Sequence, residues 1–278
     1  MGKTIAICNQ KGGTGKTTTA INVASYLALA QKKVLLLDLD PQANATSGIG
    51  INKREIQYST YHILLEEIEL DKIIQKSSLE NLWIAPANLD LTGAEVELVN
   101  VMAREFRLRK ALETQKNNYD FIIIDAPPSL GLLTINALCA ADSVIIPVQC
   151  EYYALEGVSQ LVNTVNLVKT NLNSNLEIEG VLLTMADFRT NLTKEVVVEV
   201  RKFFNDKAYT TVIPRSIRLS EAPSYGKPIV LYDKDSIGAE KYEELVREIL
   251  SRNTHGTAPT ALTQNSENTG VPAERIGA

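Results

Sequence analysis

The residues best suited to chemistry lie in the segment KGGTGKTT, which follows the apolar run Thr4–Cys8 directly. A glycine-rich turn between a strand and a helix presents several backbone N–H groups to an anion. In such a turn the Lys16 ammonium would reach the β- and γ-phosphates of a nucleotide, and the Thr17 hydroxyl would bind Mg²⁺. The segment therefore predicts a phosphate-binding loop formed by Lys11, Gly12, Gly13, Thr14, Gly15, Lys16, Thr17 and Thr18.

The loop departs from the general pattern G-x-x-x-x-G-K-[ST] at its first position, where Gln10 stands in place of glycine and Lys11 follows. Lys11 lies at the wrong end of the loop to reach the γ-phosphate of its own chain easily. A lysine supplied across a dimer would neutralise transition-state charge in the partner's site, as an arginine finger does. We therefore interpret Lys11 as a residue that acts in trans.

Three aspartates follow apolar runs that have the composition of strands. Asp38 and Asp40 are two positions apart, so both would point to the same side of a strand. Asp40 is a candidate to orient an attacking water, and Asp38 to hold the hydration shell of Mg²⁺. Asp125 ends the run Phe121–Asp125 and matches a Walker-B carboxylate that is delivered to Mg²⁺ from a neighbouring strand. In isolation each motif is also compatible with a solvated acid before a proline turn.

Continuous Val, Ile and Leu runs alternate with longer helical segments along the chain. Strands that are covered on both faces have this composition, as in a parallel sheet with helices on each side. The alternation predicts an α/β fold with a doubly wound, mostly parallel sheet and helices on both faces. The expected strands are Thr4–Cys8, Val34–Asp38, Leu82–Ala85, Phe121–Asp125, Ser143–Val148, Gly180–Met185 and Thr211–Ile213.

The longest expected helix is Thr92–Gln115, in which Val96, Val99, Met102 and Phe106 form an apolar stripe. The remaining expected helices are Thr17–Gln31, Val158–Leu172, Lys194–Phe204 and Glu240–Ser251.

The composition changes after about Asn253. Residues 254–278 are rich in Thr, Asn, Gly, Pro and Ala and contain no aromatic side chain. Such a segment cannot bury enough apolar surface to offset the entropy lost on ordering. The sequence therefore predicts one folded domain over residues 1–253 and a disordered polar tail over residues 254–278.

The composition of the whole chain argues against several classes of protein. A net charge of −5 over 278 residues argues against a generally basic nucleic-acid binder, although Lys and Arg outnumber acids between Asp187 and Lys227. No apolar run approaches the roughly 18 residues of a membrane span. The cysteines Cys8, Cys139 and Cys150 lack metal-site spacing, and we expect them to be buried, reduced thiols.

Taken together, the motifs resemble those of the ParA family of partition ATPases, in its Soj-like branch. This family belongs to the P-loop NTPases with a deviant Walker-A loop, a group that also contains MinD. The resemblance runs from about Gly2 to Asn253. It is carried by KGGTGKTT, DLDPQANATSG, DFIIIDAPPSLGLLT, GVLLTMADFRTNLTKEVV and VIPRSIRLSEAPSYGKPI.

The resemblance implies a cytoplasmic, nucleoid-associated switch that uses ATP and Mg²⁺ and releases ADP. ATP would close a homodimer that binds double-stranded DNA without sequence specificity. A ParB-like partner would stimulate a weak intrinsic ATPase activity, and the cycle would position or segregate chromosomal or plasmid DNA.

The resemblance also implies roles for individual residues around the nucleotide. Lys11 would be the intermolecular lysine of an ATP sandwich dimer, and Gly12 would lie at the dimer interface. Pro214 and Ser216 would flank the adenine, although the family usually carries Asn at position 216. The residues expected to act in hydrolysis are thus Lys11, Lys16, Asp40 and Asp125, and those expected near Mg²⁺ are Thr17, Asp38 and Asp125.

Two arginines match family positions that grip DNA. Arg189 follows the expected strand Gly180–Met185, and Arg218 follows Thr211–Ile213. Nonspecific binding needs only cations placed to meet phosphates, and a dimer doubles their number. The residues alone favour solvated surface arginines or intramolecular ion pairs, and it is the family resemblance that favours the DNA contact.

Two other functions fit the same scaffold. A MinD-like ATPase acting at a membrane would need a C-terminal amphipathic helix, but the tail has no apolar stripe and Arg275 is its only Lys or Arg. A P-loop small-molecule ligase or kinase would need a second polar constellation for its substrate, and the sequence offers none beyond the nucleotide motifs.

Overall fold

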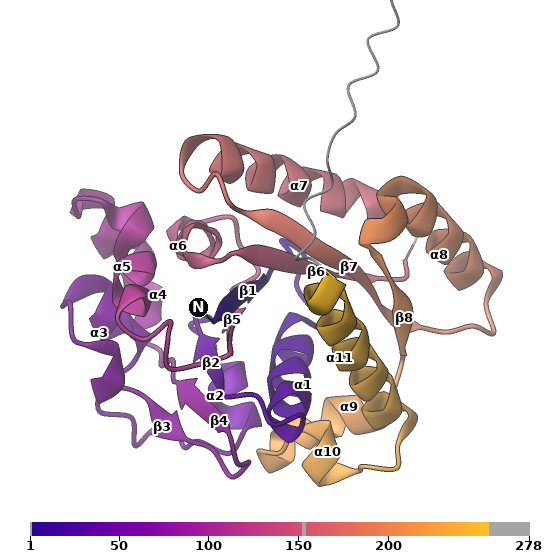
Figure 1. Ribbon diagram of the computed structural model, residues 1–278, viewed down its shortest axis with the longest axis horizontal. Helices are drawn as coiled ribbons and strands as arrows, with labels where there is room; N and C mark the ends of the chain where they lie inside the picture. Colours follow the sequence, from indigo (N-terminus) through magenta and orange to yellow (C-terminus); the bar gives the residue numbers. More distant parts are fainter. Residues whose placement is uncertain (1, 152–153, 256–278) are drawn as a thin grey trace, which may run out of the picture.

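An eight-stranded sheet runs through the middle of the molecule (Figure 1). The computed structural model describes residues 2–151 and 154–255. Every pair of neighbouring strands is parallel except β3–β4, which is antiparallel. In spatial order the strands are β3 (Gln75–Lys76), β4 (Leu82–Ala85), β2 (Val34–Asp38), β5 (Phe121–Asp125), β1 (Lys3–Ile7), β6 (Ser143–Gln149), β7 (Glu177–Ala186) and β8 (Ala208–Pro214).

Successive residues of the central strands point to opposite faces and build two separate cores. On β5, Ile122 and Ile124 join one core, whereas Phe121 and Ile123 join the other. The first core is covered by α3 (Thr60–Leu65), α4 (Leu91–Glu97), α5 (Arg107–Glu113), α6 (Leu132–Ala140), α7 (Ala154–Asn171) and α8 (Asn191–Phe204). The second is covered by α1 (Lys16–Leu29), α9 (Ile217–Glu221), α10 (Ile229–Tyr232) and α11 (Ile237–His255).

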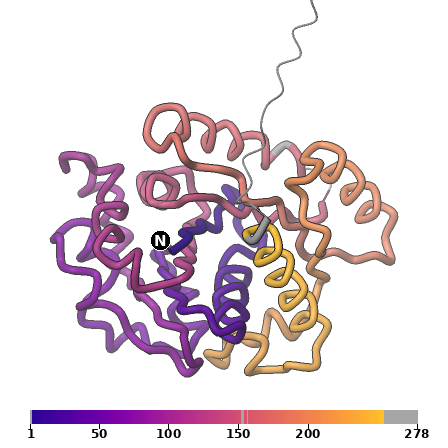
Figure 2. The backbone as a smooth tube through the Cα atoms, in the orientation of Figure 1, coloured from indigo at the N-terminus to yellow at the C-terminus, as the bar shows by residue number. Residues whose placement is uncertain are grey.

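Helices α1 and α11 lie side by side although they are far apart in the sequence (Figure 2). The buried hydroxyls of Thr19 and Tyr242 share a hydrogen bond of 3.1 Å between them. The C-terminal helix therefore packs directly against the helix that follows the glycine-rich loop.

The predicted fold class is confirmed, and each of the seven expected strands is present. Several boundaries differ from the prediction by one to four residues. Strands β7 and β8 each begin three residues earlier than expected, and α11 spans Ile237–His255 where Glu240–Ser251 was expected. The short strand β3 was not predicted. The predicted tail from residue 256 onward lies outside the described residues.

The prediction of one helix over Thr92–Gln115 is wrong. The chain breaks into α4, the 3₁₀ turns Leu98–Asn100 and Arg104–Phe106, and α5. Val96 and Met102 are 74% and 91% exposed, whereas Leu98 is fully buried. The core therefore takes a different set of positions from the stripe that the spacing indicated, and the left-handed residue Ala103 interrupts the helix.

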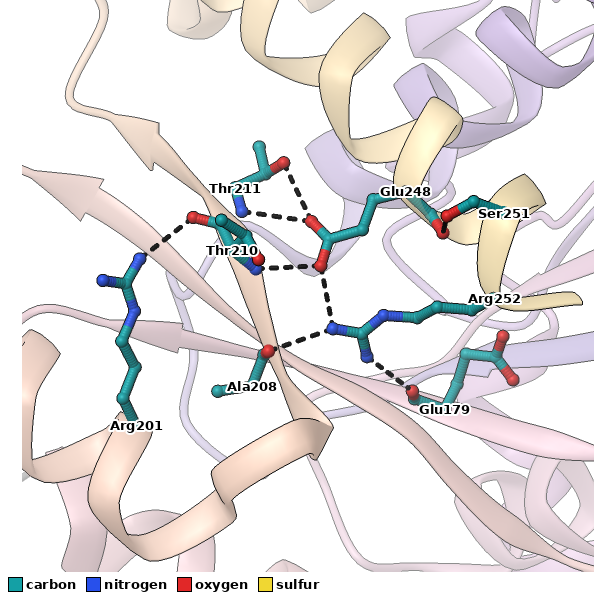
Figure 3. A network of polar contacts seen from close by, with 8 residues as sticks. All are labelled: Glu179, Arg201, Ala208, Thr210, Thr211, Glu248, Ser251 and Arg252. Carbon is teal, nitrogen blue, oxygen red and sulfur yellow. Dashed lines mark hydrogen bonds and ion pairs between the residues drawn. The ribbon is translucent and has the colours of Figure 1, made fainter. Parts of the chain in front are cut away.

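Strand β8 lies at an edge of the sheet, where backbone groups would otherwise be unpaired. Figure 3 shows how side chains of α11 cover it. The Glu248 carboxylate accepts hydrogen bonds from the backbone N–H of Thr210 at 2.9 Å and of Thr211 at 3.1 Å. Arg252 donates to the Ala208 carbonyl at 3.0 Å and to Glu248 at 2.8 Å. This edge is thus closed by an ion pair that also docks the C-terminal helix.

No helix within the described ranges is both long and apolar enough to cross a membrane.

Candidate functional site

The glycine-rich loop leaves the carboxyl end of β1 and enters α1. Gly13 and Gly15 have φ values of 74° and 85°, a region that side-chain-bearing residues rarely adopt. Gly12 has no such φ, and a Cβ atom added there would meet no atom of the described residues within 4 Å. Backbone geometry thus explains the glycines at 13 and 15, whereas nothing among the described residues requires glycine at 12.

Two lysines of the loop have different environments. The buried Lys16 ammonium donates to the Lys11 carbonyl at 3.0 Å. Burial lowers the pKa of Lys16, and the charges of Asp125 and Asp40 act in the opposite sense. The Lys11 ammonium is about half exposed and lies 2.5 Å from the Glu151 carboxylate of the same chain. Lys16 is therefore held within the loop, whereas Lys11 faces solvent.

Asp38 and Asp125 end neighbouring strands at the same register position, and both are fully buried. Asp38 is saturated by the protein: its oxygens accept from Asp40 N at 3.1 Å, Thr46 N at 2.8 Å and Thr46 Oγ1 at 2.7 Å. Burial, partly opposed by these hydrogen bonds, raises the pKa of Asp38 to about 6. These hydrogen bonds hold Asp38 to Thr46 in the short helix α2 (Asn44–Gly48). Water in the hydration shell of Mg²⁺ would therefore compete with Thr46 for the Asp38 oxygens.

Asp125 has the same burial but neither of its carboxylate oxygens has a hydrogen-bond partner among the described residues. Burial and the neighbouring Asp38 charge hold its pKa well above the usual range. The Thr17 hydroxyl is near enough to act on that pKa in the opposite sense, although the two groups form no hydrogen bond of good geometry. A buried, unpartnered carboxylate beside a hydroxyl and a phosphate loop fits a cation site.

The predicted magnesium ligands do not form an all-protein cage. Within residues 2–151 and 154–255 no group of three or more His, Cys, Asp or Glu side chains is placed to hold a metal ion. Mg²⁺ in nucleotide sites needs only one or two protein ligands, because phosphates and waters supply the rest. Thr17 and Asp125 suit this kind of site. Asp40, which is nearly buried, accepts a hydrogen bond from Gln42 N at 2.8 Å at the start of the following turn.

A cavity of about 320 Å³ adjoins the loop and contains both residues predicted to flank an adenine. Pro214 and Ser216 line it together with Gly15 and Thr18 of the loop and Tyr242 of α11. The fold therefore brings the end of β8 next to the phosphate loop, over a separation of about two hundred residues in sequence. A flat heterocycle beside the loop would find an opening of suitable size here.

Known proteins resemble this chain in both sequence and fold. The model of a family described as "AAA domain" matches residues 2–178. The sporulation initiation inhibitor protein Soj of Bacillus subtilis is 61% identical over 249 residues, covering 90% of this chain and 98% of that protein. The chain belongs to the Soj/ParA family. A second relative in this family, the chromosome partitioning protein ParA of Myxococcus xanthus, is 56% identical and covers 91% of this chain and 90% of its own length.

The fold of this Soj/ParA chain also matches a solved structure with a different name. Cobyrinic acid a,c-diamide synthase from Mycobacterium smegmatis, with bound ADP and magnesium, superposes with a TM-score of 0.81 at 34% identity. The match covers 92% of this chain and 97% of the other. The scaffold is thus shared between proteins with different names.

The two arginines predicted to meet DNA follow neighbouring strand ends, since Ala186 and Pro214 are register partners. Arg189 is 89% exposed and forms a bidentate pair with Asp187, at 2.8 and 2.6 Å. Arg218 pairs with Glu221 at 3.1 Å and with Asp233 at 3.2 Å. In this Soj/ParA chain both arginines are therefore exposed and ion-paired, and their contact with DNA stays a prediction.

Three residues around the loop were missed by the sequence reasoning: Asn9, Glu151 and Thr184. Asn9 accepts from Lys11 N at 3.0 Å and donates to the Pro147 carbonyl at 2.6 Å. Glu151 pairs with Lys11, and Thr184 donates to the loop carbonyl of Thr14 at 2.9 Å. Asn9 and Glu151 stand two residues beyond the ends of β1 and β6, and Thr184 lies in β7, two residues before its end. A polar residue near the carboxyl end of an apolar strand was the available signal.

Proposed function

We propose that this chain is an ATP-dependent dimerising switch. In its ATP state it binds DNA without sequence specificity, and hydrolysis releases it, so that chromosomal or plasmid DNA is positioned with the help of a ParB-like partner. The name of the M. xanthus relative, a chromosome partitioning protein, and the nucleotide in the M. smegmatis structure support this reading. The proposed place of action is the cytoplasm, at the nucleoid.

The observation that carries the proposal is the exposed pair Lys11–Gly12. Among the described residues Gly12 has no conformational or packing reason to be glycine, and the Lys11 ammonium is directed to Glu151 instead of the loop interior. Both features are accounted for if a second copy packs against the loop and receives Lys11. An exposed ion pair is worth at most about 1 kcal/mol, so the pair with Glu151 is easily exchanged for a phosphate.

The residues of this chain divide the work of the proposed reaction. Lys16 and the N–H groups of the loop bind the phosphates of ATP, and Thr17 and Asp125 hold Mg²⁺, which neutralises developing charge on the phosphoryl oxygens when bound. Asp40 orients the attacking water. Pro214 and Ser216 contact the adenine, where a hydroxyl offers fewer donors than the amide that is usual in the family.

A small-molecule ligase is the second candidate, because the M. smegmatis structure with the same scaffold is named a diamide synthase. That structure is 34% identical, whereas the M. xanthus chromosome partitioning protein is 56% identical over 90% of its own length. The higher sequence identity favours the partitioning function over a ligase activity.

DNA binding measured by gel shift with ATP, with ADP and without nucleotide tests the switch. Binding only with ATP is expected, and equal binding in all three states would contradict it. The double variant Arg189→Ala, Arg218→Ala should weaken DNA binding by roughly tenfold or more at matched salt. Arg247→Ala on α11, which removes an exposed cation paired with Glu243, is the matched control and should bind normally.

Lys11→Ala separates the trans role from nucleotide binding. It should abolish hydrolysis and leave the affinity for ADP within about twofold of the unchanged chain, because a lysine acting across the dimer does not contact ADP in its own subunit. Parallel loss of ADP binding would place Lys11 in its own site and remove the argument for a sandwich dimer.

A further inference from the structure

Thr184 connects strand β7 to the phosphate loop. Its side chain is 2% exposed, and its hydroxyl donates to the Thr14 carbonyl at 2.9 Å. Its own carbonyl accepts from Cys150 N at 3.1 Å, beyond the end of β6. Strand β7 is paired with β6 on one side and with β8 on the other, so the backbone that carries the Thr184 hydroxyl is held in place.

The peptide that Thr184 holds is the one between Thr14 and Gly15. In a trans peptide the C=O and N–H bonds point in opposite directions. With the Thr14 carbonyl turned to β7, the Gly15 N–H is turned away from β7, and it has no acceptor among the described residues. Because Gly15 has a φ of 85° and tolerates both signs of φ, this peptide is free to rotate unless something holds its carbonyl.

Asn9 supplies a second attachment at the beginning of the loop. It accepts from the Lys11 N–H and donates to Pro147 of β6, and it is 5% exposed. The loop is thus fixed at its start by β6 and near its end by β7. The N–H groups between these two points remain available to an anion.

We propose that Thr184 is a positioning residue for nucleotide binding, whose hydroxyl orients the Thr14–Gly15 peptide so that the Gly15 N–H is available to a nucleotide phosphate. The role concerns nucleotide affinity alone, so it is independent of DNA binding and of the partner protein. A preoriented donor adds affinity because no ordering is needed when the phosphate arrives.

The test compares Thr184→Val with Thr184→Ser. Valine keeps the branched shape and removes the donor, whereas serine keeps the donor. Calorimetric titration with Mg-ADP should show affinity reduced by roughly tenfold for Thr184→Val and within about twofold of the unchanged chain for Thr184→Ser. Thr184→Ala serves as the second donor-free variant if valine prevents folding, and should show the same loss.

Thr211→Val is the matched control, because Thr211 is also a buried strand residue whose hydroxyl donates to an acceptor, Glu248, at 3.0 Å. It should lower the melting temperature of the nucleotide-free protein without changing ADP affinity. The proposal is overturned if Thr184→Val binds ADP like the unchanged chain, or if Thr184→Ser is weakened as much as Thr184→Val. No ADP binding by the unchanged chain would overturn the nucleotide site itself, together with this role.

Discussion

The carboxyl edge of the sheet and the outer edge of β8 both carry a buried or nearly buried carboxylate, but the two carboxylates differ in their hydrogen bonding. At the carboxyl edge, Asp125 is fully buried and its oxygens have no partner among the described residues. At the outer edge, Glu248 is 16% exposed and accepts from two backbone N–H groups, the Thr211 hydroxyl and Arg252.

The difference separates polar groups whose hydrogen bonds stabilise the fold from polar groups that the described residues leave without a partner. A buried carboxylate without partners costs free energy, because it loses its water and gains nothing in exchange. At Asp125, beside the glycine-rich loop, this cost lowers the stability of the fold, and a bound cation would supply the missing partner. At Glu248 the same chemical group contributes to stability and has no reactive neighbour.

The largest expected effect is at Asp125. If Asp125 binds Mg²⁺ as proposed, Asp125→Asn should reduce ATP hydrolysis on the order of 100-fold, because the cation would lose its carboxylate ligand. The same change should raise the melting temperature of the nucleotide-free protein, since it removes a buried charge that has no partner.

Asp38→Asn is the control at the same register position. Its carboxylate holds Thr46 and Asp40, so its replacement should lower the melting temperature. If thermal unfolding showed both variants destabilised alike, Asp125 would be a structural residue and the comparison would fail.

A smaller effect is expected at the outer edge. Glu248→Ala should lower the free energy of unfolding by about 2 kcal/mol, because two backbone N–H groups and Arg252 lose their acceptor. Hydrolysis per folded molecule should not change. Glu243→Ala, which removes an exposed i,i+4 partner of Arg247 on the same helix, should unfold like the unchanged chain.

The effect at Glu248 should depend on pH. Burial acts to raise the pKa of Glu248, but the hydrogen bonds from Thr210 and Thr211 outweigh it and leave the pKa lowered. A lowered carboxyl pKa stabilises the fold fully above the unfolded value of about 4.3, and this stabilisation is lost as the pH falls through the folded value. Urea unfolding at pH 7 and pH 3.5 should therefore show the difference between Glu248→Ala and the unchanged chain shrinking at the lower pH.

The smallest effect is expected on the exposed stripe near α4. Met102→Ser should change the free energy of unfolding by less than about 0.5 kcal/mol, because the side chain is 91% exposed. Leu98→Ala, a few residues away, should cost about 2–5 kcal/mol, because Leu98 is fully buried. Denaturant titration of the two variants measures both free energies of unfolding and so tests whether Met102 is exposed and Leu98 is buried.

The sequence was sufficient for seven of the eight strands and for the turn of the glycine-rich loop because their signals are local. Parallel strands covered on both faces are continuous apolar runs, and the turn at Gly13 and Gly15 needs glycine. The prediction failed at Thr92–Gln115 because Val96, Val99 and Met102 repeat at helical spacing without being buried. Spacing identifies an amphipathic face, but only tertiary packing decides which apolar residues the core accepts.

The sequence indicated several residues that the fold brings together around the loop, but not the contacts that each of them makes. Asp38 and Asp125 have the same local pattern, an acid at the end of an apolar strand, yet one is saturated and the other has no partner. Which of the two is left free depends on Thr46, which is eight residues after Asp38 and belongs to a different element. Thr184 was missed for the same reason, since its partner Thr14 is 170 residues away.

The two margins of the sheet also limit how copies of this protein can associate. One margin is β3, only two residues long and antiparallel to β4, and the other is β8, whose backbone groups are occupied by α11. At the β8 margin a second molecule could not lengthen the sheet without displacing the Glu248–Arg252 pair, and at the other margin β3 offers only two residues for pairing. Continuous strand-to-strand polymers are therefore disfavoured even in concentrated solution, and copies must meet through loops and helices instead.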